Sequence, residues 1–181
     1  MSDTPVTHLT PEQLERGLSG VLSSPQDDGL VEMLIVRPAE NERLTPESVD
    51  VTSLLGVNGD HWSKDKYREM PDIQIAIINS RLLDLVSGGR DRWSLAGDNI
   101  VADLDLSQAN LVPGQKLRTG TAVLEITDTP HEGCKKFASR FGSAALRFVN
   151  VGPAKELRLR GIYARVIQDG MIAVGDRIQK L

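Results

Sequence analysis

The sequence predicts a mainly β, α+β fold, a small closed β-barrel with short helices inserted in its connections. Three observations predict it: short apolar segments recur between Gly-containing and Pro-containing turns, helical segments are few and short, and strands do not alternate with helices as in βαβ units. The chain has 181 residues, enough for one sizeable core and few for two full domains. We predict an N-terminal appendage with a short helix over residues 1–29 and a single barrel domain over residues 30–181.

The first predicted elements are a helix and a strand. The segment Thr10 to Gln13 combines an N-cap residue, a proline in the first helical turn and a capping-box Gln, so a short helix should run to about Gly17. The apolar stretch 30–36 is closed by Pro38 and predicts the first strand. Residues 39–60 are rich in loop-forming residues, and we expect them to be mainly loop.

The middle of the chain predicts a strand, a helix and three further short strands. Residues 73–78 form an apolar run, and Ser80 can cap a short helix that ends at Gly88-Gly89. Short strands are expected at 99–102, 115–118 and 122–126, the last with a clear alternation of apolar and polar residues.

The last third of the chain begins with helical spacing and returns to strands. Residues 135–141 and 144–148 are expected to be helical, so Cys134 lies directly before a helix. Strands are expected at 162–167, 171–174 and 176–178, with a turn at Asp169-Gly170.

Composition and charge exclude several classes of protein. The formal net charge is −4, from 21 Lys and Arg against 25 Asp and Glu, and aromatic residues make up only 4% of the chain. This balance disfavours a polyanionic partner, and no aromatic platform for single-stranded bases is available. One cysteine cannot form an intramolecular disulfide, and the N-terminus has no signal-peptide pattern. The single cysteine and this N-terminus lead us to expect a cytoplasmic protein, and the charge balance leads us to expect no nucleic-acid partner. No apolar run reaches membrane-spanning length, so we expect no membrane association.

Cys134 has the sharpest chemical context in the sequence. Lys135, Lys136 and the start of the predicted helix would all favour the thiolate over the thiol. The alternative is a small buried hydrophobic residue, which is the more frequent role of a lone cysteine.

Two histidines are further candidates. His131 lies three residues before Cys134 and could act as a base, or it could be a solvent-facing residue of a turn. His61 could be a metal ligand, a substrate contact or a hydrogen-bonded loop residue. A closed zinc site of four protein ligands is disfavoured, because the chain has one Cys, three scattered His and neither CxxC nor HExxH. One soft thiolate still suits a transition metal whose other sulfur ligands come from a cofactor.

The motifs of nucleotide-binding sites (GxxxxGK[ST] and GxGxxG) and of α/β-hydrolases (GxSxG) do not occur in the sequence. Basic residues, in contrast, gather in short clusters. The clusters could line a pocket for an anionic ligand, or they could be solvated faces. They comprise Lys64, Lys66 and Arg68; Arg90 and Arg92; Lys135, Lys136 and Arg140; and Arg158 and Arg160. Gly97-Asp98-Asn99, by itself, is typical of an Asx turn.

Several segments together resemble the MOSC domain family, named after the C-terminal domain of molybdenum cofactor sulfurase. The resemblance covers roughly residues 55–178. The resemblance is found in the segments Gly59-Asp60-His61, Gly97-Asp98-Asn99-Ile100, Pro113 to Thr127, Cys134, and Gly161 to Val166 with Val174-Gly175-Asp176. It departs from the family at Gly133, where family members often have a proline.

The resemblance implies a β-barrel that binds the molybdenum cofactor, a pterin dithiolene with a phosphate. Cys134 matches the defining cysteine of the family, which carries a persulfide or ligates molybdenum. Asp98 and Asn99 match the Gly-acidic-Asn motif beside the cofactor, and His61 and Arg68 match positions near its pterin or phosphate. Lys135, from the basic cluster beside Cys134, completes the predicted cofactor-binding set.

The resemblance leads to three functional hypotheses. The first is a cofactor-binding sulfur carrier or sulfurtransferase that acts through Cys134 and receives sulfur from a cysteine desulfurase or another donor. The second is a molybdenum-dependent oxidoreductase that reduces N-hydroxylated compounds and needs a redox partner. The third is a non-catalytic cofactor-binding module. An acceptor molybdoenzyme is a further expected partner, and pyridoxal phosphate is expected only on a separate donor protein, because this chain is too short to include a desulfurase domain.

Overall fold

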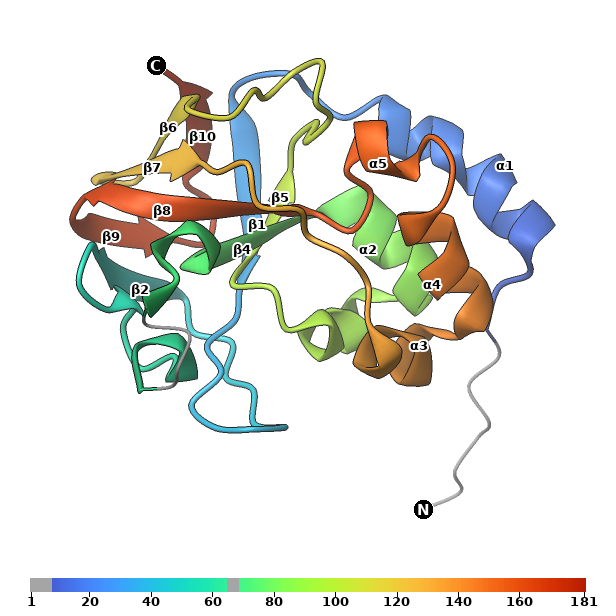
Figure 1. The fold of residues 1–181 in the computed structure, drawn as a ribbon, viewed down its shortest axis with the longest axis horizontal. Coiled ribbons are helices and arrows are strands. Elements are labelled where there is room, and N and C mark those ends of the chain that lie inside the picture. The colour runs from blue at the N-terminus through green and yellow to red at the C-terminus, as the bar shows by residue number, and fades with distance from the viewer. Residues whose placement is uncertain (1–7, 65–68) are drawn as a thin grey trace.

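Seven strands close into a barrel, in the order β1-β10-β6-β7-β8-β4-β5 and back to β1 (Figure 1). The computed structural model describes residues 8–64 and 69–181. The barrel strands are β1 Gly29–Leu34, β4 Ile75–Asn79, β5 Ile100–Asp103, β6 Lys116–Thr119, β7 Ala122–Ile126, β8 Ile162–Gln168 and β10 Arg177–Lys180. The predicted mainly β barrel is thereby confirmed.

A second, three-stranded sheet lies beside the barrel, with β2 Ser48–Thr52 between β3 Gly56–Val57 and β9 Gly170–Ala173. The prediction that residues 39–60 are mainly loop is therefore wrong for β2 and β3. The missed signal in β2 is a period of two, because Val49 and Val51 are buried while Ser48 and Asp50 are exposed. β2 pairs with β9, which lies near the C-terminal end of the chain. The sequence of residues 39–60 alone therefore does not predict this pairing.

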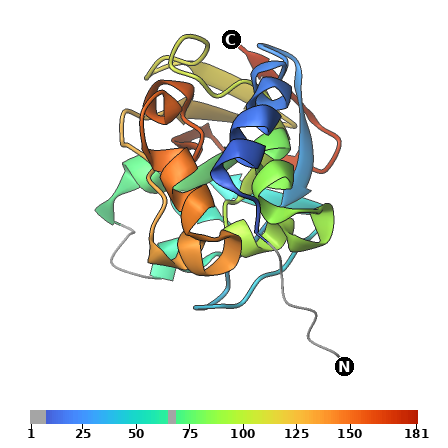
Figure 2. The ribbon, with the colours of Figure 1, turned by 90° about the vertical axis from the view of Figure 1, so that its right-hand side faces the viewer.

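The helices gather on one side of the barrel and form a layer of their own (Figures 1 and 2). They are α1 Pro11–Leu22, α2 Ser80–Ser87, α3 Lys135–Phe141, α4 Ser143–Asn150 and α5 Ala154–Leu157. A second apolar core joins them to the outer face of the barrel, with Leu14, Leu83, Phe141 and Val149 among its buried residues. The barrel interior is a separate core built from Val, Leu, Ile and Ala side chains.

The first helix is longer than predicted. It runs to Leu22 rather than to about Gly17, and the predicted capping box at Thr10 and Gln13 is present. Gly17 does not end the helix. A Cβ at this position would lie 2.4 Å from a methyl carbon of Leu85, so the glycine lets α1 pack closely on α2. The division into residues 1–29 and 30–181 stays a prediction.

The connection from β4 to β5 is a βαβ unit, which the sequence was not expected to contain. β4 and β5 are parallel, and α2 and a 3-10 helix at Arg90–Ala96 lie between them. The cap of α2 is Asn79 rather than Ser80, because the Asn79 side-chain oxygen accepts the backbone N–H of Leu82 at 2.9 Å. The predicted end of the helix at Gly88 is confirmed, since Gly88 is a left-handed C-cap.

Candidate functional site

Cys134 lies at the end of an irregular segment that follows β7, and it is the N-cap residue of α3. The thiol is exposed, so the alternative of a small buried hydrophobic residue is wrong. The pKa of the thiol is lowered: its partial burial raises the pKa, but the backbone N–H groups of Phe137 and Lys136 and the positive charges of Arg160 and Arg140 outweigh that effect. The Cys134 side chain makes no cap hydrogen bond at the start of α3. The site therefore favours a solvent-accessible thiolate.

A buried ion pair lies close to this cysteine. Arg160 donates from Nη1 to both carboxylate oxygens of Asp98, at 2.8 and 3.0 Å, and the Asp98 side chain is fully buried. The Arg160 guanidinium also lies 5.1 Å above the centre of the Phe137 ring in α3, a cation–π contact. Asp98 thus holds the arginine whose charge helps to lower the pKa of Cys134, and the carboxylate itself is fully buried.

His131 is buried beside the same ion pair. Its ring stacks on Tyr163 with 4.1 Å between centroids, and its side chain is 7% exposed, so the solvent-facing alternative is wrong. The pKa of His131 is held well below its usual value by burial first, and then by the positive charges of Arg160 and Arg37. The imidazole is therefore neutral, and its Nδ1, 3.7 Å from Asp98, has no hydrogen-bond partner within residues 8–64 and 69–181.

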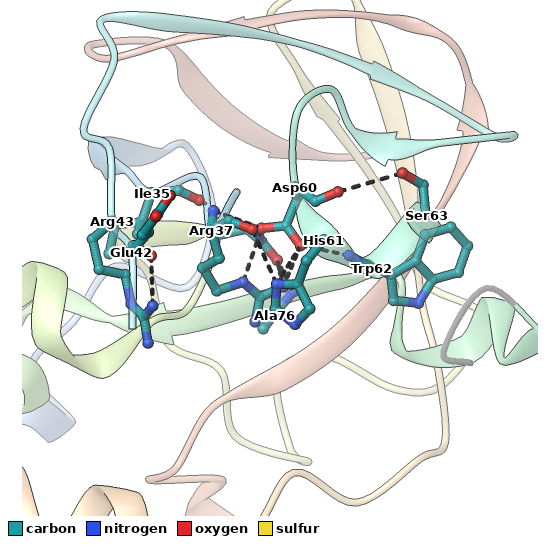
Figure 3. Close-up of polar contacts among 10 residues, drawn as sticks. Ile35, Arg37, Glu42, Arg43, Asp60, His61, Trp62, Ser63 and Ala76 are labelled. Atoms are coloured by element: carbon teal, nitrogen blue, oxygen red, sulfur yellow. Dashed lines mark hydrogen bonds and ion pairs between the residues drawn. The ribbon is translucent and has the colours of Figure 1, made fainter. Parts of the chain in front are cut away.

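A second polar network is centred on Asp60 (Figure 3). Arg37 forms a bidentate pair with this carboxylate, Nε to Oδ2 at 2.9 Å and Nη2 to Oδ1 at 3.0 Å. The pKa of Asp60 is lowered, because the charge and hydrogen bonds of Arg37 outweigh burial, which raises it. Arg37 is not among the site residues predicted from the sequence, although it directly follows the first predicted strand and precedes Pro38.

Asn99 joins this network to the barrel. Its side-chain oxygen accepts from the backbone N–H of Ala76 at 3.1 Å and from Arg37 at 3.3 Å, and its nitrogen donates to Asp60 at 3.1 Å and to the carbonyl of Ile35 at 3.3 Å. All four contacts are internal and the residue is buried. Asn99, like its neighbour Asp98, therefore fixes an arginine rather than presenting its own side chain to a ligand.

His61 lies at the edge of the Asp60 network, at the start of a 3-10 helix (Figure 3). Its Nδ1 is 3.0 Å from the carbonyl oxygen of Arg37. Because a carbonyl oxygen can only accept, this contact assigns the proton to Nδ1 and leaves Nε2 as the free ring nitrogen. Lys135 is exposed at the first position of α3, and Arg68 lies outside the described residues.

A cavity of about 420 Å³ opens beside these residues and is rich in positive charge. Its basic lining residues come from three separate parts of the chain: Arg43, His61, Lys64 and Lys136. At its rim, Lys136 pairs with Glu40 at 2.6 Å, with both side chains exposed. The cavity thus combines residues from the β1–β2 connection with the start of α3, two residues after Cys134.

Arg43 is the most unusual of these cations. The pKa of its guanidinium is lowered by burial and then by the positive charges of Arg140 and Arg37, and its buried Nε has no hydrogen-bond partner among the described residues. Gly97 makes room for it, because a Cβ there would lie 3.1 Å from Nη2 of Arg43. An anion in this cavity would relieve the mutual repulsion of the arginines.

Within the described parts of the chain, no group of three His, Cys, Asp or Glu side chains could hold a metal ion. A metal at Cys134 would therefore need ligands other than a cluster of these side chains. No described helix is long and apolar enough to cross a bilayer.

Comparison with known proteins agrees with this architecture. The family model described as MOSC domain matches residues 65–179, more than half of the chain. The chain belongs to the MOSC domain family. This match includes Asp98, Asn99, Cys134 and Arg160, whereas Arg37, Arg43 and Asp60 lie before it.

Solved structures share the fold of this MOSC protein. The YuaD protein from Bacillus subtilis is 19% identical, with a TM-score of 0.62 and coverage of 83% of this chain and 93% of that chain. YiiM from Geobacillus stearothermophilus is 18% identical, with a TM-score of 0.56 and coverage of 84% and 75%. YiiM from Escherichia coli is 16% identical, with a TM-score of 0.54 and coverage of 84% and 69%. No curated protein sequence matches the chain significantly.

Proposed function

We propose that this MOSC protein binds the molybdenum cofactor and acts as a sulfur carrier or sulfurtransferase through Cys134. The observation that carries the proposal is the exposed Cys134 thiol, whose pKa is lowered by backbone N–H groups and by Arg160 and Arg140 against the opposing effect of burial. A thiolate is the form that attacks sulfur and that binds a metal. Membership in the MOSC family supports the cofactor.

Sulfur transfer needs only the thiolate and a donor persulfide. The Cys134 sulfur attacks the terminal sulfur of the donor, a new S–S bond forms, and the old S–S bond breaks with release of the donor thiolate. No net oxidation or reduction takes place. The donor would be a cysteine desulfurase, with its pyridoxal phosphate on that separate protein, and the acceptor would be the cofactor or a molybdoenzyme that carries it.

The residues around Cys134 fit the cofactor by charge and by donor type. A thiolate is a soft ligand that suits a transition metal, and the protein offers no competing cluster of ligands in its described part. Arg43, Lys64 and Lys136 would hold the phosphate, since the buried Arg43 Nε has no hydrogen-bond partner in the described part of the chain. His61 would contact the pterin or phosphate through Nε2, and Asp98 and Asn99 would act by fixing Arg160 and Arg37. When bound, the cofactor supplies a metal centre capable of redox chemistry.

The same arrangement supports a second candidate, the reduction of N-hydroxylated compounds. The observation that favours it is the exposure of the Cys134 thiol, because a metal held by this thiolate would then be accessible to a substrate. A redox partner would then supply the electrons. A non-catalytic cofactor-binding module is the third candidate.

The first experiment measures the molybdenum content of the protein purified from a cofactor-producing host, alongside Cys134→Ser. Near-stoichiometric molybdenum that is lost in the variant supports Cys134 as the metal ligand and favours the reductase. Absence of molybdenum from both proteins counts against cofactor binding and leaves the sulfur carrier to be judged by the next experiment.

The second experiment incubates the protein with a cysteine desulfurase and cysteine and records its intact mass. We expect a gain of one sulfur atom, about 32 Da, in the wild type and none in Cys134→Ser. An unchanged wild-type mass contradicts the sulfur-carrier proposal. Cofactor-loaded protein with an artificial electron donor and hydroxylaminopurine tests the reductase, which lack of turnover over several N-hydroxylated compounds would reject.

A further inference from the structure

A second cavity lies between the connection from β7 to α3 and the helices α4 and α5 (Figure 1). It encloses about 230 Å³, and its walls are formed mainly by residues 127–132, the end of α4, the start of α5 and residues 158–162. Among the described residues, none lines both this cavity and the basic cavity beside Arg43. The two cavities are therefore separate sites.

Three cations line this second cavity, and two of them have carboxylate partners. Lys155 lies 3.8 Å from a carboxylate oxygen of Glu132, with both side chains exposed. Arg160 pairs with the buried Asp98. Arg158 is the third cation, and no described residue forms an ion pair with it. The lining thus offers one guanidinium group to an anionic ligand.

Arg158 occupies an unusual backbone position. It is the C-cap of α5 in the left-handed conformation, with φ +48°, where glycine is the usual residue. Its side chain is half-buried, and burial lowers the pKa of the guanidinium while the charge of Asp128 raises it. Nη1 of Arg158 donates to the carbonyl oxygen of Leu111. A guanidinium has five N–H donors, and the described residues provide no other partner for them.

Two further polar atoms of lining residues have no partner. Nε of Arg160 and Nδ1 of His131 are buried, and neither has a hydrogen-bond partner among the described residues. A buried donor without a partner is costly, so an acceptor that reaches Arg160 from the cavity would stabilise it. The neutral His131 adds no charge to the site.

We propose that this cavity is a binding site for a small organic monocarboxylate, whose carboxylate pairs with Arg158 and whose apolar part lies against an aliphatic wall. That wall consists of the buried side chains of Val149, Ala154 and Ile162. The planar guanidinium matches a carboxylate with two parallel hydrogen bonds. The ligand has to be small, because pockets for drug-sized molecules enclose about 300–1,000 Å³.

The charge of the lining favours a monoanion over a dianion. Asp128 and Glu132 also line the cavity, so a phosphate would meet two carboxylates there. The lining of the basic cavity beside Arg43 is richer in positive charge and suits a phosphate better. The carboxylate site goes beyond the proposed function, because it needs neither Cys134 nor the cofactor.

The test is a titration of the whole isotope-labelled protein with butyrate at millimolar concentrations, followed by NMR. We expect saturable shifts of backbone amides within residues 127–132 and 158–162. Butyramide, which lacks the charge, should bind at least about tenfold more weakly. Inorganic phosphate should not displace butyrate. The proposal is overturned if butyrate causes no saturable shift at these residues, if butyramide binds equally well, or if phosphate displaces butyrate at similar concentration.

Two variants change the charge of the cavity in opposite directions. Arg158→Gln removes the guanidinium and should weaken butyrate binding at least about tenfold, since hydrogen bonds to a charged group are lost. Asp128→Asn removes a negative charge at an exposed residue that acts on Arg158, and it should strengthen binding about twofold. Weaker binding in Asp128→Asn, or unchanged binding in Arg158→Gln, contradicts the proposed pairing.

The matched control is Arg92→Gln. Arg92 is also half-buried and donates to backbone carbonyl oxygens, those of Ser87 at 2.8 Å and Arg140 at 2.7 Å, but it does not line this cavity. We expect unchanged butyrate affinity in this variant. Equal weakening in Arg92→Gln and Arg158→Gln would show a general loosening of the fold and overturn the proposal.

A second variant, Arg158→Lys, serves if the glutamine variant does not fold. It keeps the charge but loses the two parallel hydrogen bonds, so we expect a smaller loss of butyrate affinity than in Arg158→Gln. Unchanged affinity in Arg158→Lys counts against the pairing of the carboxylate with the guanidinium.

Discussion

Replacing Asp98 with Asn tests how much the buried ion pair contributes to the fold. Asp98 is fully buried and meets Arg160 in two contacts of 2.8 and 3.0 Å, while the Arg160 side chain is only 10% exposed. Asp98→Asn keeps the shape of the side chain and removes its charge, so the Arg160 cation stays buried without a counter-ion. Breaking a buried pair from one side costs about 3–5 kcal/mol. For a chain of this size this corresponds to a fall in Tm of roughly 6–20 °C.

The assay is urea unfolding followed by tryptophan fluorescence, with Asp98→Asn beside the double variant Asp98→Leu/Arg160→Met. We expect the double variant to recover at least half of the loss, because apolar residues of similar volume often replace a buried pair at little cost. A loss below about 1 kcal/mol in Asp98→Asn would refute the reasoning, since it would mean that water already reaches the Arg160 guanidinium. A double variant as unstable as the single one would show that packing, rather than charge, sets the loss.

Three further predictions concern pH, charge and backbone. Because the pKa of His131 is lowered on folding, the unfolded chain binds more protons below the unfolded pKa of about 6.5. The free energy of unfolding should therefore fall from pH 7.5 to pH 5.5, and His131→Gln should reduce that fall. Arg43→Gln should leave Tm unchanged or raise it, because it removes a partly buried cation that has no ion-pair partner among the described residues. Arg37→Gln should lower Tm, because it removes the cation that pairs with the buried carboxylate of Asp60; calorimetry of both variants checks the contrast. Gly161→Ala should destabilise the protein by at least about 2 kcal/mol in urea, since Gly161 has φ +107° and an added Cβ would lie too close to a backbone oxygen of β4.

Local signals in the sequence predicted most barrel strands because each strand is a short apolar segment between turns. The same kind of evidence failed for β2 and β3, whose pairing with each other and with β9 decides their structure. It also failed for the parallel pair β4 and β5, because the helix between them has only eight residues and resembles an insertion in a connection. Strand pairing is a long-range property that local periodicity does not contain.

The candidate site was predictable only in part for the same reason. Cys134 could be found from its neighbours in the sequence, and Asp98 and Asn99 from the resemblance to the MOSC family. Their hydrogen-bonding partners are distant in the sequence. Asp98 and Arg160 are 62 residues apart, and so are Asn99 and Arg37. Asp98 and Asn99 are also buried, and their side chains hydrogen-bond to Arg160 and Arg37, which the sequence alone does not show.

The strand β10 bears on the order in which this protein folds. It lies between β1 and β6, so Gly29 at the start of β1 pairs with Ile178, close to the last residue of the sequence. Contacts between such distant parts of a chain form slowly, and the barrel remains an open sheet until residues 177–180 arrive. Until then β1 and β6 have unpaired edges that can join another chain. A truncation before residue 177 should therefore produce aggregates rather than a smaller folded barrel, although every residue of the Cys134 site would still be present.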